Sequence, residues 1–174
     1  MAEQFDRNTW QTPKYVFNWL DKRFGFDIDG CANEKNTLCS SWVGEGSPLG
    51  SDFLDTNTPY PYRNLRFYVN PPYSEVAPFL MAARELKDKG HLVVMLLNND
   101  KSTQWYQNHI HGVANEVIDI VGGRIAFIHP VTNQEIKGNS KGQMIVVFDP
   151  EMQDFVQRSV SLDFIKKVGG YDGK

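Results

Sequence analysis

Residues 92–97 form the most apolar run of the chain, with the sequence Leu-Val-Val-Met-Leu-Leu and no polar residue among them. A strand with one face in water alternates apolar and polar residues, whereas a continuous run of this length is typical of a parallel strand buried on both faces. We therefore expect residues 92–97 at the centre of a sheet that helices cover on each side.

Two helices are predicted before this run, and each has clear boundary signals. Residues 13–24 form the first, with Thr12 as the N-cap, Pro13 in the first helical position and Gly25 after the last turn. In the second, apolar residues recur at helical spacing from 79 to 86, Pro78 falls in the first turn and Gly90 follows the end. Residues 103–109 and 155–164 favour two further helices.

Shorter apolar runs predict further strands. They cover residues 26–32, 38–43, 65–69, 116–121, 124–128 and 142–148. Helices and strands alternate in the first half of the chain, whereas strands follow one another in the second half. This order predicts an α/β fold with a doubly wound mixed sheet and a C-terminal antiparallel hairpin.

Length and composition predict a single domain over residues 1–174, with its core at about 9–150 and a flexible end at about 169–174. No apolar run reaches membrane-spanning length and the first residues lack a basic, apolar leader, which predicts a cytoplasmic protein. The net charge of −3 means that any contact with nucleic acid must be local.

The cysteines and histidines do not indicate a metal site. Cys31 and Cys39 are too few for a disulfide framework or a zinc cluster, so free thiols are expected. His109 and His111 are two residues apart, not the four that place two ligands on one face of a helix. We therefore predict no metal.

Asn70-Pro71-Pro72-Tyr73 follows a predicted strand, at the edge where an open α/β sheet binds its ligands. Each proline keeps the preceding residue extended, so the side-chain oxygen of Asn70 and the main-chain oxygen of Pro71 can converge. Two acceptors without a general base suit an NH2 group on a conjugated ring, and Tyr73 offers a face on which that ring can stack.

This tetrapeptide predicts the transfer of an activated methyl group to nitrogen, with rate gained from orientation and electrostatics. The predicted catalytic residues are Asn70, Pro71, Pro72 and Tyr73. The alternative interpretation is an ordinary proline-rich turn that closes a strand.

Several separate motifs resemble those of the phage-type DNA N6-adenine methyltransferases, and they stand in the same order over residues 9–150. The motifs are Trp10-x-Thr12-Pro13, Phe26-Asp27-Ile28-Asp29-x-x-Ala32, Asn70-Pro71-Pro72-Tyr73-Ser74, Trp105, Gly123-Arg124-Ile125-x-Phe127 and Val146-Val147-Phe148. The resemblance implies a methyltransferase-like sheet and methyl transfer from S-adenosylmethionine to adenine N6 in DNA. For a phage-encoded protein, the compartment would be the host cytoplasm.

The resemblance also implies a set of cofactor contacts. They are Trp10, Thr12, Pro13, Asp29, Asp52 and Phe53. Asp29 ends a predicted strand at the ligand-binding edge, and Asp52 with Phe53 resembles the acid-aromatic pair that holds the cofactor's adenine. The alternatives are a loop-capping or turn-opening role for each aspartate, and a helix staple for Trp10. The usual glycine-rich loop is reduced to Gly30.

An adenine inside a duplex hides N6, so the enzyme must flip the base out or act on a single strand. A polar segment, residues 137–141, is the predicted DNA-facing loop; the alternative is a solvated hairpin. The predicted DNA contacts are Lys101, Arg124, Lys137, Asn139, Ser140 and Lys141. No long segment remains for a target-recognition domain, so short or relaxed specificity is expected.

Two alternatives to adenine methylation stay open at this point. The same tetrapeptide occurs in methyltransferases that act on cytosine N4 or on protein glutamine, because all three bind a planar NH2 group. The chain could also be a non-catalytic nucleic-acid-binding or anti-restriction module on a decayed methyltransferase fold, since its glycine loop is reduced and its net charge is negative.

Overall fold

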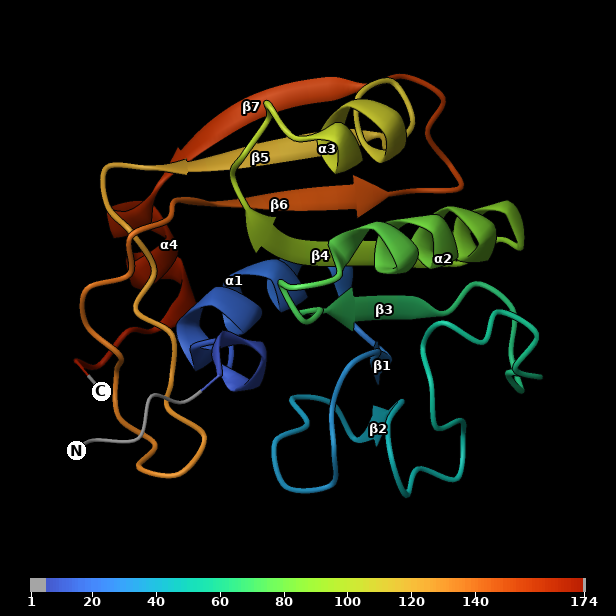
Figure 1. Ribbon diagram of the computed structural model, residues 1–174, viewed down its shortest axis with the longest axis horizontal. Coiled ribbons are helices and arrows are strands. Elements are labelled where there is room, and N and C mark those ends of the chain that lie inside the picture. Colours follow the sequence, from blue (N-terminus) through green and yellow to red (C-terminus); the bar gives the residue numbers. More distant parts are fainter. Residues whose placement is uncertain (1–5, 174) are drawn as a thin grey trace.

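The computed structural model describes residues 6–173, and these contain a mixed sheet of seven strands (Figure 1). The strands are β1 (Ile28–Asp29), β2 (Ser41–Trp42), β3 (Arg66–Val69), β4 (Leu92–Asn98), β5 (Glu116–Val121), β6 (Gln143–Phe148) and β7 (Val156–Ser161). Their order across the sheet is β2-β1-β3-β4-β6-β5-β7. Strands β1 to β4 are parallel, β6 is antiparallel to both of its neighbours, and β7 is parallel to β5.

The prediction of an α/β fold with a mixed sheet is confirmed. The apolar run 92–97 lies in β4, the middle strand, and all six residues are buried. β4 pairs in parallel with β3 and antiparallel with β6. The expected antiparallel pairing late in the chain is the β5–β6 pair, and β7 extends the sheet beyond it.

Two element predictions in the second half of the chain are wrong. Residues 124–128 do not form a strand, since only Ile128 pairs, through isolated bridges to Gln11 and Glu135. Residues 156–161 were expected in a helix but form β7, because the free edge of β5 offers all six of them a continuous ladder of partners. The last helix begins only at residue 162.

Helices cover both faces of the sheet, which gives three layers (Figure 1). They are α1 (Lys14–Phe24), α2 (Val76–Asp88), α3 (Gln104–His109) and α4 (Leu162–Gly169). One apolar cluster joins the sheet to α2 and α3, and the other joins it to α1 and α4. Successive side chains of β3 point to opposite faces of the sheet and so belong to different clusters, since Phe67 and Val69 face α2 whereas Tyr68 faces α1.

Helix α1 begins one residue later than expected. Pro13 is the N-cap, and Thr12 does not cap the helix because its hydroxyl lies 2.6 Å from the hydroxyl of Tyr68. The predicted end is confirmed, since Gly25 takes a left-handed conformation with φ of 64°. Such a backbone favours glycine over any residue with a Cβ atom.

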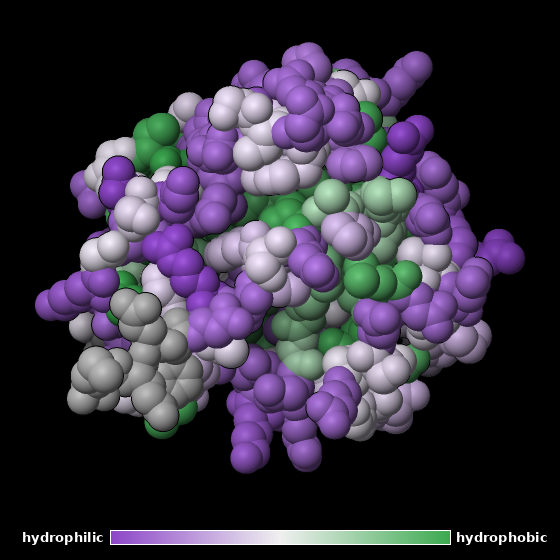
Figure 2. All heavy atoms as spheres, viewed as in Figure 1, coloured by the Kyte–Doolittle hydropathy of each residue, from purple (hydrophilic) through white to green (hydrophobic). Residues whose placement is uncertain are grey.

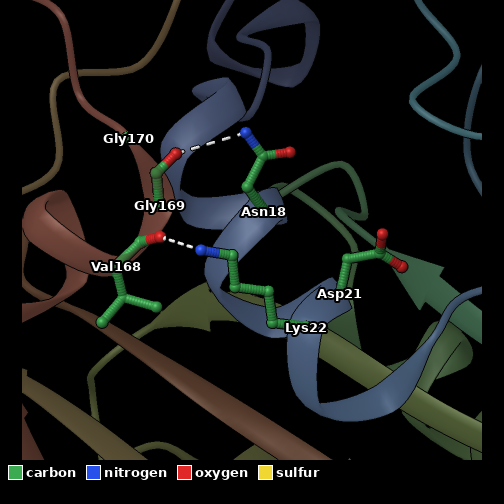
Figure 3. Close-up of a pocket in the computed structure, with 6 residues that line it drawn as sticks. All are labelled: Asn18, Asp21, Lys22, Val168, Gly169 and Gly170. Carbon is green, nitrogen blue, oxygen red and sulfur yellow. Dashed lines mark hydrogen bonds between the residues drawn. The ribbon is translucent and has the colours of Figure 1, made fainter.

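The end of α4 is tied to α1 around a small pocket of about 270 Å³ (Figure 3). Asn18 donates to the carbonyl oxygen of Gly169 at 3.2 Å, and Lys22 donates to that of Val168 at 2.6 Å. Tyr171 then packs edge-on against Tyr15, with ring centroids 5.0 Å apart. Gly169 and Tyr171, which the sequence places in a flexible end, make these contacts with α1.

Residues 6–173 contain neither a helix that could span a membrane nor a group of side chains that could bind a metal ion. No helix of residues 6–173 is long and apolar enough to cross a bilayer. Over the same residues, no three His, Cys, Asp or Glu side chains are grouped so that they could hold a metal ion. Figure 2 shows hydrophilic residues around the rim of one face and hydrophobic residues gathered near its middle.

Candidate active site

Three polar or aromatic side chains meet at the carboxyl edge of the parallel strands. Asp29 ends β1 and lies opposite Tyr68 of β3, and Asn70 is the first residue after β3. Tyr68 and Asn70 both lie on the α1 side of this edge, since residues of α1 line the same cleft. This edge is where open α/β sheets bind their ligands.

A cleft of about 1350 Å³ opens at this edge. Asp29, Tyr68 and Asn70 belong to its lining, and its other walls come from residues 8–18, 33–38, 128–133 and 169–172. Of the residues predicted from the sequence, the cleft brings together Trp10, Thr12, Asp29 and Asn70. Pro13 is buried at the start of α1 and does not line it.

The Asn70 amide is oriented by two neighbours. Its Nδ2 donates to the main-chain oxygen of Trp10 at 3.3 Å, and its Oδ1 accepts from the Tyr73 hydroxyl at 2.9 Å. One lone pair of Oδ1 therefore stays available. Among residues 6–173, no hydrogen bond uses the Pro71 oxygen, whereas the Pro72 oxygen accepts from the amide of residue 75. Asn70 lines the cleft, whereas Pro71 is buried and does not, so the convergence of the two oxygens on one amine stays a prediction.

Tyr73 is placed differently from the expectation. Its ring contacts both apolar clusters, lies edge-on to Phe127 at 6.0 Å and is not part of the cleft lining. Burial raises the pKa of its phenol well above the usual range, which keeps it a proton donor to Asn70. In this arrangement the Tyr73 hydroxyl orients the amide of Asn70, with the main-chain oxygen of Leu96 as an alternative acceptor at 3.3 Å, and its partly buried ring does not line the cleft.

Asp29 is buried, with 4% of its surface exposed. Its carboxylate accepts from the amide of Cys31 at 3.3 Å and from that of Leu38 at 3.1 Å. Burial raises the pKa of Asp29 to about 6, against the two hydrogen bonds, which lower it. No cation within residues 6–173 forms an ion pair with this carboxylate. A cationic ligand in the cleft would supply the missing charge.

The predicted pair of Asp52 and Phe53 is not at the cleft. Asp52 is exposed and accepts from the amide of Leu54 at 2.9 Å, which is the turn-opening role. Phe53 is buried on the α2 side of the sheet, where it stacks on Phe79 with ring centroids 5.9 Å apart and an interplanar angle of 6°. Its position makes it a core residue behind the loop that follows β1.

Four of the predicted DNA contacts are engaged within the protein. Lys101 lies 2.6 Å from a carboxylate oxygen of Asp119, and Arg124 donates to the main-chain oxygen of Asn139 at 3.2 Å. Asn139 is buried and its side chain binds Ile125 and Gln143, so it holds its loop and is not presented to DNA. Ser140 is exposed, and its hydroxyl accepts from the Arg7 guanidinium at 3.4 Å. The remaining two, Lys137 and Lys141, are also exposed.

Some residues at the cleft were not selected from the sequence. Lys14 and Lys35 add two exposed cations to its lining. Val131, 68% exposed, lies on a turn in which Nδ1 of His129 accepts from two backbone amides, at 3.1 and 3.2 Å. These residues come from separate segments without any local motif, so only the tertiary fold brings them to one place.

The model of the family DNA N-6-adenine-methyltransferase (Dam) matches residues 2–169. The chain belongs to this family. It is 36% identical over 176 residues to the DNA N-6-adenine-methyltransferase of Haemophilus phage HP1 (strain HP1c1), covering 97% of this chain and 95% of that relative. It is 30% identical over 168 residues to the DNA N-6-adenine-methyltransferase of Escherichia phage T1, covering 88% of this chain and 67% of that relative.

The protein is therefore an adenine-specific DNA methyltransferase, and the resemblance stated from the sequence motifs is confirmed. Family membership decides against the alternatives that the sequence left open, namely methylation of cytosine N4, methylation of protein glutamine and a non-catalytic module. The family uses S-adenosylmethionine, a cation with a sulfonium and an ammonium group. The methyltransferase cleft fits such a ligand, because Asp29 is a buried carboxylate without an ion-pair partner among residues 6–173.

Proposed function

We propose that Asn70 and Pro71 hold the exocyclic amine of the target adenine during methyl transfer. The observation that supports this role most directly is the fixed Asn70 amide, which has Nδ2 on the Trp10 oxygen and Oδ1 toward Tyr73. The free lone pair of Oδ1 and the unused Pro71 oxygen are two acceptors for the two N–H groups of the amine. Accepting both draws the nitrogen away from conjugation and makes it more nucleophilic.

The cofactor belongs in the same cleft, with Asp29, Thr12 and Trp10 around it. When bound, S-adenosylmethionine supplies an electrophilic methyl group. The charge of Asp29 is complementary to this cation, and the face of Trp10 favours it by cation–π attraction. Gly30 directly follows Asp29, and a Cβ atom there would lie 2.8 Å from Val69 and 3.1 Å from Phe53, so the close packing of this loop against the core requires glycine.

Catalysis in this proposal comes from position and not from a general base. With S-adenosylmethionine bound, its methyl group would pass to the adenine nitrogen while sulfur keeps the electron pair of the broken carbon–sulfur bond, and the nitrogen would then release one proton to water. Asn70 and Pro71 stabilise the positive charge that develops on the nitrogen, because both present oxygen acceptors to it. Pro72 contributes the fixed backbone of the turn.

The DNA is proposed to approach over the cleft mouth with the adenine flipped out or single-stranded. The exposed cations Lys14 and Lys35 are suitable for phosphates, and Val131 is an apolar side chain on a rigid turn beside them. Lys137 and Lys141 are the exposed lysines of the loop, residues 137–141, that the sequence predicts to face the DNA. We propose that residues 1–174 act as one domain with short or relaxed specificity, since lysines at the cleft mouth can contact phosphates but do not read bases directly.

Labelled methyl transfer to matched single-stranded and duplex oligonucleotides tests this proposal. The expected product is N6-methyladenine in both, with a slower rate on the duplex because unpairing costs a few kcal/mol. Abasic or nicked sites opposite the adenine should restore the duplex rate. A duplex rate equal to that of the single strand, unchanged by these lesions, would contradict the requirement for base flipping.

A further inference from the structure

The segment of residues 6–12 crosses the active-site cleft, and we refer to it as the N-terminal strap. It begins with the 3-10 helix η1 (Arg7–Thr9), in which the Asp6 carboxylate accepts from the amide of Asn8 at 3.0 Å. It then pairs with the loop before β6, since Gln11 and Ile128 exchange two backbone hydrogen bonds of 3.0 and 2.9 Å. In Figure 1 the strap lies beside α1 at the carboxyl edge of the sheet.

The strap contacts both ends of the catalytic turn. At the start of the turn, the main-chain oxygen of Trp10 accepts from Nδ2 of Asn70 at 3.3 Å. At its end, Asn8 and Ser74 form two hydrogen bonds, with Nδ2 of Asn8 donating to the Ser74 hydroxyl at 2.9 Å and Oδ1 of Asn8 accepting from the Ser74 amide at 3.2 Å. A paired contact of this kind fixes orientation as well as distance.

The position of the Trp10 oxygen is thus fixed from two sides. Asn8 anchors the strap to Ser74 on one side of Trp10, and Gln11 anchors it to Ile128 on the other. The indole itself is also held, because the Arg7 guanidinium lies 4.7 Å above its ring centroid and Phe127 lies 5.9 Å from it. Among residues 6–173, the Trp10 oxygen is the only hydrogen-bond acceptor for Nδ2 of Asn70, so this end of the amide depends on the strap.

We propose that Asn8 is a positioning residue for methyl transfer, and that its pairing with Ser74 keeps the Asn70 amide in the orientation that presents Oδ1 to the adenine amine. An amide turned by 180° would present N–H groups to another N–H donor, and transfer from that orientation would fail. The inference rests on the proposed role of Asn70. Asn8 itself touches neither the adenine nor the methyl group in this account.

A double-mutant cycle on kcat tests the inference. Asn8→Ala removes both hydrogen bonds to Ser74 and should lower kcat about tenfold, whereas Ser74→Ala removes only the hydroxyl contact and should lower kcat about threefold. The double variant should lose about tenfold rather than about thirtyfold, because the contact that Ser74→Ala removes is already absent in Asn8→Ala. Ser74→Thr keeps both hydrogen-bonding groups and should retain the wild-type kcat. The Kd for S-adenosylmethionine, measured by calorimetry, should stay within twofold in every variant.

Two control variants, together with the Asn70→Ala enzyme, distinguish failure of this inference from failure of the proposed function. Asn57→Ala and Ser159→Ala replace exposed residues away from the cleft and should leave kcat unchanged. Losses from Asn8→Ala and Ser74→Ala that multiply, or that come with weaker cofactor binding, would overturn the positioning role. Wild-type kcat for both, with an inactive Asn70→Ala enzyme, would overturn this inference alone. An active Asn70→Ala enzyme would instead overturn the proposed function.

Discussion

Replacing Asp29 by asparagine removes a charge that is buried in the cleft. In the cofactor-free protein, burial raises the pKa of this carboxyl from 3.8 to about 6. Because the folded state binds the proton more tightly than the unfolded state, the stabilising effect of that proton is complete below about pH 4. It is lost as the pH rises toward 6, and above that the ionised carboxylate destabilises the fold by a constant amount.

The shift of about two pKa units corresponds to about 3 kcal/mol. Asparagine avoids this cost but offers one acceptor oxygen to the two amides of Cys31 and Leu38, so one amide loses its partner at a cost of about 1 kcal/mol. The net expectation for Asp29→Asn at pH 8 is a gain of about 2 kcal/mol, or about 5 °C in Tm. At pH 5 only about half of the cost has developed, because the folded carboxyl is largely protonated while the unfolded one is ionised, so the gain should fall to below about 1 kcal/mol.

Thermal and urea unfolding of the cofactor-free proteins at pH 5 and pH 8 provide the measurement. In the same variant, S-adenosylmethionine should bind at least tenfold more weakly at pH 8, because an interaction with a charged group contributes about 1.5–3 kcal/mol. Asp29→Leu is a poorer probe, since it leaves both amides unpaired. A variant that is less stable than the wild type at pH 8, with unchanged cofactor affinity, would show that Asp29 is only a cap for the following loop.

Two further substitutions test other assignments. Phe53→Ala should lower the free energy of unfolding by about 3–5 kcal/mol, as for other buried aromatic core residues. Its Kd for S-adenosylmethionine, measured at low temperature, should stay within a few-fold of the wild-type value. A stable variant with greatly weakened cofactor binding would support the cofactor role first expected for Phe53. Tyr73→Phe removes the donor to Oδ1 of Asn70 and should lower kcat about tenfold with little change in Tm, and an unchanged kcat would refute the orienting role of that hydroxyl.

The sequence predicted best where the signal is local. The apolar run of β4 and the strand before Asn70 are recognisable from consecutive residues, and both lie where expected. Asp52 was predicted at the cofactor because a cofactor-binding acid and a turn-opening aspartate have the same local sequence. In the fold its carboxylate accepts a hydrogen bond from the Leu54 amide, away from the cleft. β7 was missed because the edge of β5, and not its own sequence, makes it a strand.

The contacts around Asn70 could not be predicted in this way. Asn8 and Ser74 are 66 residues apart in the sequence, and no periodicity connects them. The same holds for the Trp10 oxygen, because a main-chain acceptor leaves no signature in the residue type. The tetrapeptide therefore indicated the chemistry, while the parts that orient its amide depend on tertiary packing.

Turnover of the Asn70→Ala enzyme, measured together with its cofactor affinity, tests the central claim most directly. The account predicts that the variant binds S-adenosylmethionine within a few-fold of the wild-type Kd, while kcat for N6-methyladenine formation falls by about a hundredfold to a thousandfold, as when a preorganised polar contact to the reacting group is removed. An Asn70→Ala enzyme that methylates adenine at a near-normal kcat would contradict the claim that this amide holds the reacting nitrogen.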